Sequence, residues 1–129
     1  MGAIDRPPRY ADAVHPYSGA RRVGELVFVS GQLGVDAQGE LTGDVVAETH
    51  QAIANLRSQL IAFGADLCDV VKINAYLADL ADRNSFDAVY VGYFVEPRPT
   101  RTCIEAGGLP FGARVEIEAV ACVPRPDGG

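Results

Sequence analysis

The feature that most constrains the fold is a pair of alternating runs near the C-terminus. Residues 101–106 place Arg101, Cys103 and Glu105 on one side, because successive side chains of a strand point to opposite faces. Residues 114–123 alternate in the same way, with apolar side chains at every second position from Val115. Residues 107–112, between the runs, are rich in glycine and proline. The pattern predicts two strands joined by a loop.

The register of these two strands decides which side chains meet. An antiparallel pairing with Cys103 opposite Glu116 would bring a guanidinium, a thiol and a carboxylate onto one face. The loop is too long to specify that register. Arg101, Cys103 and Glu116 are therefore candidate site residues, and they share one face of the sheet if this register holds.

The rest of the chain predicts further strands and two helices. Residues 24–30 predict a strand buried on both faces, followed by short strands at 33–36 and 40–41. Residues 44–63 predict a helix, which Thr42 or Asp44 would cap and Gly64 would end. The solvated face of this helix is expected to carry Glu48, His50 and Arg57. A strand at 70–77 and a helix from about 82 to 95 complete the pattern. The expected apolar stripes are Val46, Ile53, Leu56, Leu60 and Phe63 on the first helix, and Phe86, Val89, Tyr90, Tyr93 and Phe94 on the second.

Strands that bracket two helices predict an α+β fold, with one mixed sheet and both helices packed on one face. The sheet's other face would expose an apolar patch that is unusual for a monomer, which predicts an oligomer. That patch comprises Leu26, Phe28, Val120 and Cys122. We expect a single domain over residues 1–129, with a loose segment at 1–13 and a disordered tail at 124–129.

Charge and composition exclude several classes of function. The net charge of −6, without a cluster of lysine and arginine among aromatics, argues against nucleic acid as a partner. No apolar run is long enough to span a membrane, and the first ten residues lack the apolar stretch of a signal peptide. Three widely spaced cysteines fit neither a disulfide framework nor a zinc site. We expect a cytoplasmic protein.

Common catalytic motifs are missing from the sequence. It contains no GxSxG, P-loop, GxGxxG or HExxH motif, and its two histidines lie in different segments. Arg101 is the strongest single candidate, because a guanidinium presents a rigid fork that matches a carboxylate. The alternative is a structural ion pair of Arg101 with Glu105, Glu116 or Glu118. Glu116 could instead be an ordinary carboxylate that faces solvent from a strand.

Three separated motifs resemble those of one known family. They are Pro99-x-Arg101-x-Cys103 followed by the hydrophobic and glutamate strand at 115–118, Pro16-Tyr17-Ser18, and the turn at 29–32. This pattern, which extends from about residue 14 to 123, is similar to that of the Rid family of reactive-intermediate deaminases (RidA/YjgF type). The resemblance implies a chorismate-mutase-like fold and a homotrimer with active sites in the clefts between subunits.

The resemblance also implies a reaction and a set of site residues. Such enzymes hydrolyse 2-enamino and 2-imino acids, of the 2-iminobutanoate/2-iminopropanoate type, to 2-keto acids and ammonia, without a metal or other cofactor. Arg101 would bind the substrate carboxylate and Glu116 would activate water. The Cys103 thiol is a weaker candidate as a nucleophile, and its backbone amide would help to hold that water. The substrate-binding set implied is Arg101, Tyr17, Ser30, Gly31, Cys103 and Asp87.

The sequence departs from the family pattern at a few positions. His15 and Gly19 flank Pro16-Tyr17-Ser18, Gly34 replaces a common proline, and Asp87 replaces an asparagine typical of the second helix. These departures are compatible with a second hypothesis, a hydrolase or small-molecule-binding protein of the same fold with a different, pathway-specific substrate. A chaperone-like or protein-interaction module is a third hypothesis, and a ribonuclease, against which the acidic net charge argues, is a fourth. Tyr17 and Ser30 also have the alternative of ordinary satisfied hydroxyls.

Overall fold

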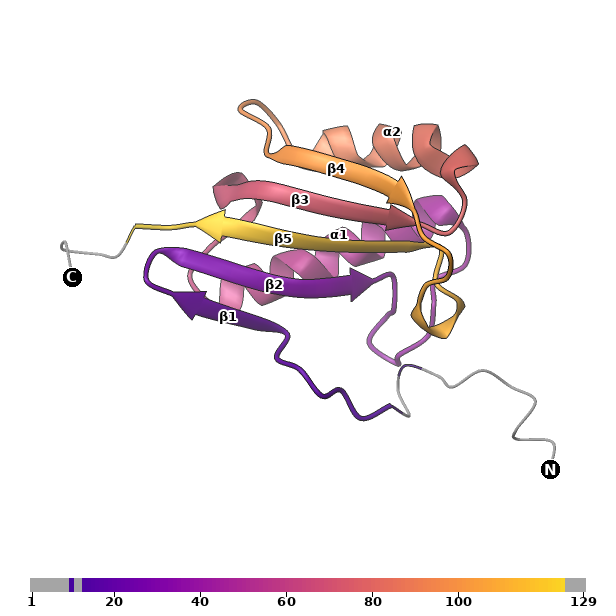
Figure 1. Cartoon of the computed structure of the whole chain (residues 1–129), viewed down its shortest axis with the longest axis horizontal. Coiled ribbons are helices and arrows are strands. Elements are labelled where there is room, and N and C mark those ends of the chain that lie inside the picture. The colour runs from indigo at the N-terminus through magenta and orange to yellow at the C-terminus, as the bar shows by residue number, and fades with distance from the viewer. Residues whose placement is uncertain (1–9, 11–12, 125–129) are drawn as a thin grey trace.

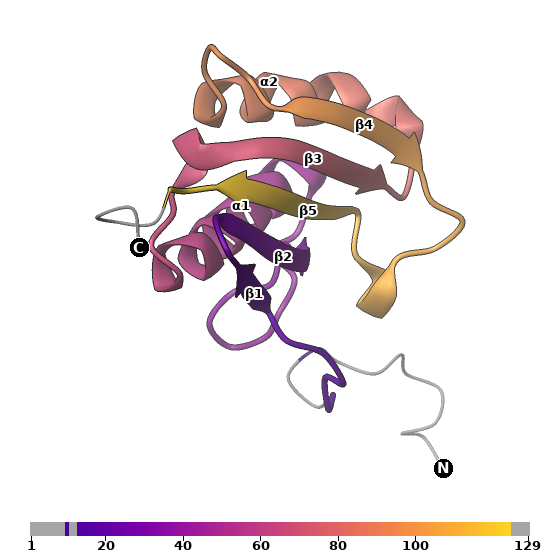
Figure 2. The ribbon, with the colours of Figure 1, turned by 60° about the vertical axis from the view of Figure 1, so that its left-hand side comes forward.

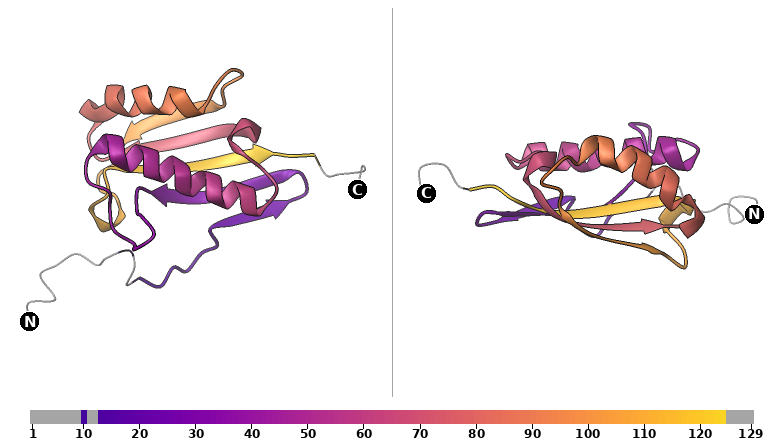
Figure 3. Two further views of the ribbon diagram at one scale, coloured as in Figure 1. Left: turned by 180° about the vertical axis from the view of Figure 1, so that it is seen from behind. Right: turned by 90° about the horizontal axis from the view of Figure 1, so that it is seen from above.

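The computed structural model describes residue 10 and residues 13–124 of the chain. The expected loose segment at 1–13 and tail at 124–129 therefore lie outside the described residues, apart from Tyr10, Ala13 and Pro124. Five strands form one mixed sheet, and two helices cover one of its faces (Figures 1 and 3). The elements are β1 (Ala20–Val23), β2 (Leu26–Leu33), α1 (Val45–Ala62), β3 (Val70–Leu77), α2 (Arg83–Tyr93), β4 (Thr100–Glu105) and β5 (Val115–Cys122). The predicted α+β class is confirmed.

The order of the strands is β1-β2-β5-β3-β4, which corrects the predicted pairing of the last two strands (Figure 2). β3 lies between β4 and β5, so that Ala75 pairs with both Cys103 and Ile117. β4 runs parallel to β3, because α2 connects them as a crossover, whereas the other pairs are antiparallel. The predicted pairing of Cys103 with Glu116 is therefore wrong. The loop before β5 crosses the end of β3 instead of closing a hairpin.

Three predictions for the first part of the chain were also wrong. The strand expected from Gly24 begins at Leu26, because Gly24 has φ +60° and turns the chain between β1 and β2. The strands expected at 33–36 and 40–41 reduce to a single bridge between Val35 and Leu41. β2 is buried on one face only, since Val27 is buried whereas its neighbour Phe28 is exposed.

Local signals predicted α1 well. The Asp44 carboxylate accepts a hydrogen bond of 2.8 Å from the Ala47 amide, and Gly64, with φ +83°, follows the end of the helix. The stripe prediction holds for Ile53, Leu56 and Leu60, which are fully buried, but Val46 is exposed. Glu48 was predicted to be solvated and is instead fully buried.

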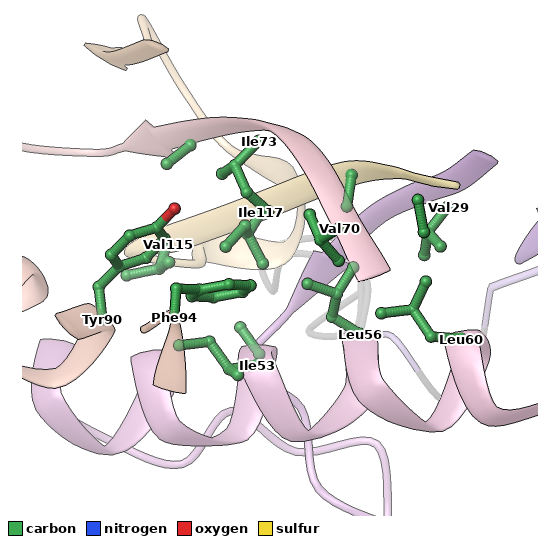
Figure 4. Close-up of a cluster of buried hydrophobic side chains, with 14 of the residues drawn as sticks. Val29, Ile53, Leu56, Leu60, Val70, Ile73, Tyr90, Phe94, Val115 and Ile117 are labelled. Carbon is green, nitrogen blue, oxygen red and sulfur yellow. The ribbon is translucent and has the colours of Figure 1, made fainter. Parts of the chain in front are cut away.

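The core lies between the sheet and the helices (Figure 4). From α2, Phe86 and Tyr90 enter it together with Phe94, which follows the helix, whereas Tyr93 remains exposed. Each fully buried side chain of this size stabilises the fold by roughly 1.5–3 kcal/mol. Neither helix of the described chain has the length and apolar character needed to cross a bilayer.

Candidate functional site

The predicted site residues form two groups on opposite faces of the sheet. Arg101 and Cys103 pair with Ile73 and Ala75, which are buried beneath the helices, so they lie on the helix-covered face. Glu116 lies between the buried Val115 and Ile117 and therefore points to the open face. We call Arg101, Cys103 and Asp87 the Arg101 group, and Tyr17, Ser30, Gly31 and Glu116 the Glu116 group. The prediction that Arg101 and Glu116 lie on the same face of the sheet is therefore wrong.

The Arg101 group is built around an ion pair between β4 and α2. Nη1 of Arg101 donates a hydrogen bond of 2.6 Å to Oδ1 of Asp87, so the alternative of an ion pair with Glu105, Glu116 or Glu118 is wrong. The other oxygen, Oδ2, lies 3.8 Å from Nε of Arg83, one helical turn earlier. The Arg101 side chain is 18% exposed and that of Asp87 34%, so both reach the surface. Within the described part of the chain, Nε and Nη2 of Arg101 have no hydrogen-bond partner.

Aromatic rings hold the Arg101 guanidinium on one side. Its central carbon lies 4.8 Å from the Tyr90 ring centroid and 5.7 Å from that of Phe86. Burial lowers the pKa of Arg101, but the hydrogen bond and negative charge of Asp87 outweigh it, so the net shift is upward and the group stays charged. Burial raises the pKa of Tyr90 to about 12. The Tyr90 hydroxyl is buried and has no hydrogen-bond partner among the described residues.

The environment of Cys103 makes its thiol a poor nucleophile. Its side chain is partly buried and packs against the core. Burial raises the pKa of the Cys103 thiol, and the charge of Arg101 only partly offsets that effect. Because the thiolate is the reactive form, the geometry favours a packing role for this side chain.

The Glu116 group lies where β2 and β5 pair. A Cβ on Gly31 would lie 2.7 Å from the carboxyl carbon of Glu116, so the side chain of Glu116 packs directly on the Gly31 backbone. Burial raises the pKa of Glu116, and the negative charge of Glu118 raises it further. A carboxyl group with a raised pKa holds its proton to a higher pH than a solvated glutamate does, which favours a role in proton transfer.

Tyr17 and Ser30 are the two hydroxyl-bearing members of the Glu116 group. The Ser30 hydroxyl donates a hydrogen bond of 2.6 Å to the Ser18 carbonyl, which joins β2 to the segment before β1. The Tyr17 hydroxyl lies 3.2 Å from Nδ1 of His15. Burial raises the pKa of Tyr17, and the charges of Tyr10 and Glu116 add to the shift. Tyr17 and Ser30 also line a cavity of about 500 Å³, together with Phe28, Asn74, Glu118 and Val120 among others.

Some residues around the two groups were not predicted from the sequence. Arg83 was missed, although its i,i+4 spacing from Asp87 on a predicted helix is a usable signal. Tyr90 was assigned to the core, and nothing in the sequence shows that its ring also carries the Arg101 guanidinium. In the sequence, His15 stands out only as a departure from the family pattern. Its ring is packed against that of Tyr10, with centroids 4.5 Å apart.

The two groups place different chemistry on the two faces of the sheet. The Arg101 group provides a charged fork with two donor nitrogens that are unpaired within the described residues, and the Glu116 group provides a carboxyl group with a raised pKa. The cavity beside the Glu116 group is also lined by Arg21 and Lys72. Neighbouring strands are about 4.8 Å apart, so β4 and β5 are separated by about 10 Å before their side chains diverge. Across residues 10 and 13–124, no cluster of three or more His, Cys, Asp or Glu side chains could hold a metal ion.

Comparison with known proteins shows relatives over nearly the whole chain. Residues 8–123 match the family model described as Endoribonuclease L-PSP. The chain is 47% identical over 110 residues to RutC family protein y4sK of Sinorhizobium fredii, covering 84% of this chain and 87% of that protein. It is 44% identical over 111 residues to a 2-iminobutanoate/2-iminopropanoate deaminase of Capra hircus, covering 84% and 81%. The crystal structure of RidA from Psychrobacter sp. PAMC 21119 matches with a TM-score of 0.83 at 38% identity, covering 92% of this chain and 94% of that one.

Proposed function

Because the chain belongs to the YjgF/RidA family, we propose that it hydrolyses reactive 2-imino and 2-enamino acids to 2-keto acids and ammonia. Relatives of this chain are named as deaminases of 2-iminobutanoate and 2-iminopropanoate, and we propose substrates of that type. The observation that carries the proposal is the Arg101 fork. It is permanently charged, backed by Tyr90, and keeps two donor nitrogens unpaired within the described residues. A small carboxylate is the ligand that this arrangement suits.

The proposed chemistry consumes one water. Arg101 holds the substrate carboxylate, and Glu116 takes a proton from the water as its oxygen forms a bond to the imine carbon. The electron pair of the C=N bond moves to nitrogen, which then takes up protons. Cleavage of the C–N bond releases ammonia and leaves the keto carbonyl. In this scheme no metal or other cofactor takes part.

We further propose that the Arg101 group and the Glu116 group are the two halves of one site. The halves meet between subunits of a homotrimer, which we place in the cytoplasm. On one chain, Arg101 and Glu116 occupy opposite faces of the sheet, so they cannot act on the same small molecule. The open face exposes Leu26 and Phe28, beside the cavity lined by Tyr17 and Ser30. Burial of that apolar surface against another subunit would stabilise an assembly. The Arg101 group of one subunit would then face the Glu116 group of its neighbour.

A mixing experiment tests the reaction and the assembly together. A threonine dehydratase generates 2-iminobutanoate in the presence of a trapping amine, and faster release of 2-oxobutanoate reports hydrolysis. We expect Arg101→Lys and Glu116→Gln each to abolish the acceleration. Subunits of the two variants are then unfolded together at equal amounts and refolded. Because each site would draw one residue from each of two subunits, about a quarter of the sites regain both residues, and activity returns to about a quarter of wild type.

The controls separate the parts of this proposal. Each variant refolded alone must stay inactive, and mixing each with wild type gives the reference for recovery. If the wild-type protein does not accelerate imine hydrolysis, the proposed reaction is wrong. If hydrolysis occurs but mixing restores no activity, both residues act from one chain and the inter-subunit site is wrong.

Two observations support a second candidate function, in which the same fold acts on a different small carboxylate. Asp87 occupies one arm of the Arg101 fork, and His15 contacts Tyr17 at the Glu116 group. Both groups thus carry an added ionisable side chain. A screen of imines and keto acids in the same assay would identify a preferred substrate other than 2-iminobutanoate. The net charge of −6 makes RNA a poor candidate in that screen.

A further inference from the structure

We propose that Asp87 is a specificity-determining residue that makes the Arg101 site select a zwitterionic ligand, with a carboxylate beside a protonated nitrogen. For an imino acid, the selected form is the protonated iminium carboxylate. The inference rests on the proposed function, because it assumes that Arg101 binds the substrate carboxylate.

The geometry divides the Arg101 fork between two tasks. Nη1 is engaged by Asp87, whereas Nε and Nη2 are left for an incoming carboxylate, with no partner in the described part of the chain. Asp87 is the more exposed member of the pair, so its carboxylate lies at the mouth of the site. Its Oδ2 is 3.8 Å from Nε of Arg83, beyond hydrogen-bond distance, and therefore keeps the capacity to accept a proton donor from a ligand.

Two of the three charges at this position, those of Arg101 and Asp87, match those of a zwitterion, and Arg83 adds a second positive charge on the far side of Asp87. Arg101 and Asp87 present a positive and a negative group side by side, in contact at 2.6 Å. In a 2-imino or 2-amino acid, the nitrogen is bonded to the carbon that carries the carboxylate, so the two ligand charges are also fixed side by side. A ligand with its carboxylate on Arg101 then has its protonated nitrogen near Asp87. A keto acid offers only a carbonyl oxygen there, which the negative charge of Asp87 repels.

The selection would favour the reactive form of the substrate. A protonated C=N bond accepts the electron pair of an attacking water more readily than a neutral one, because nitrogen becomes a neutral amine instead of an anion. It would also favour release of product, since the keto acid that forms has lost the cation that Asp87 holds.

Calorimetric titration with two ligands of the same carbon skeleton tests this inference. The zwitterion 2-aminobutanoate stands for the protonated imine, and 2-oxobutanoate is the matching monoanion without a cation. We expect wild type to bind the amino acid at least tenfold more tightly, and Asp87→Asn to lose that preference, since one charge-assisted hydrogen bond corresponds to about tenfold in affinity. Asp87→Glu, which keeps the charge, should retain a preference of the same sign.

A matched control removes one negative charge elsewhere. Glu25 is an exposed residue at the turn between β1 and β2, away from the Arg101 group. Glu25→Gln should leave the affinities for 2-aminobutanoate and for 2-oxobutanoate unchanged. If Asp87→Asn changes both affinities by the same factor, Asp87 only orients Arg101 and the inference is overturned. Wild type without a preference, or without binding of either ligand, overturns it as well. Hydrolysis without a binding preference contradicts this inference alone, and a preference without hydrolysis contradicts the proposed function alone.

Discussion

Replacement of Arg114 by methionine should destabilise the protein much more than replacement of a surface arginine. Arg114 lies just before β5 and donates hydrogen bonds to the buried carboxylate of Glu48 on α1. Its backbone amide donates to Oε1 at 2.8 Å, and its Nη1 donates to Oε2 at 2.9 Å. The Glu48 side chain is 0% exposed and that of Arg114 49%. The pair therefore fixes the start of the strand that carries Glu116.

The expected magnitude follows from that difference in burial. Removing one partner of a buried ion pair costs about 3–5 kcal/mol, because the remaining charge is left uncompensated. Arg114 is half exposed and its backbone hydrogen bond survives the substitution, so we expect a loss of about 2–3 kcal/mol. Arg57 is the matched control, since it pairs with Asp66 at 2.8 Å with side chains 55% and 40% exposed. An exposed pair of this kind contributes little to stability, because water and salt screen its charges.

Urea denaturation measures both losses, at equal protein concentration because assembly stabilises the folded chain. The double variant Glu48→Gln/Arg114→Met should recover about 1 kcal/mol or more relative to Arg114→Met alone, because it buries an amide instead of an unpaired charge. Equal losses for Arg114→Met and Arg57→Met, within about 0.5 kcal/mol, would refute the reasoning. A double variant less stable than Arg114→Met would refute the role of the buried charge in particular.

Two further predictions concern the Glu116 group. Since burial and Glu118 raise the pKa of Glu116 above 4.5, folding favours its protonated form, and this contribution to stability is present at low pH and is lost as pH rises through the raised pKa. Glu116→Gln should therefore gain stability relative to wild type between pH 4 and pH 7, and a constant difference in thermal unfolding would contradict the shift. Gly31→Ala should lower kcat by about 10–100-fold with little change in melting temperature, because the new Cβ displaces the Glu116 carboxyl group. Gly92→Ala, where a Cβ meets nothing within 4 Å, is its control, and equal kcat values for the two variants would contradict the prediction.

Local signals predicted most elements of the fold but not their arrangement. Asp44 and Gly64 mark the ends of α1 within a few residues of sequence, and the alternation from Val115 identifies the buried side of β5. The neighbours of β4 depend on a long-range choice, because the same alternation suits a hairpin with β5 or a crossover beside β3. β1 was missed since it is short and its arginines give no apolar pattern.

The same limit applies to the candidate site. Motifs identified Arg101 and Glu116 as candidates, but the face that each side chain occupies depends on the strand order. Glu48 was assigned to a solvated face because a charged side chain on a helix is usually exposed. Its partner, Arg114, is 66 residues away, and a pairing at that separation leaves no local pattern. Asp87 was predicted to lie in the site, whereas its hydrogen bond to Arg101 is visible only in the structure.

The surroundings of Arg101 favour its charged form, whereas those of Glu116 disfavour its charged form. This difference supports the separate roles proposed for the two residues. Arg101 is desolvated, but Asp87 compensates its charge and the Tyr90 ring lies against it, so the fork remains cationic. Glu116 is also desolvated, but the charge that acts on its pKa is the like charge of Glu118, so its anionic form is disfavoured. Environments that push two ionisable groups in opposite senses are the usual basis for dividing binding from proton transfer. Arg101 is thereby suited to hold an anion at any physiological pH, and Glu116 to exchange a proton with water, even though one chain keeps them on opposite faces.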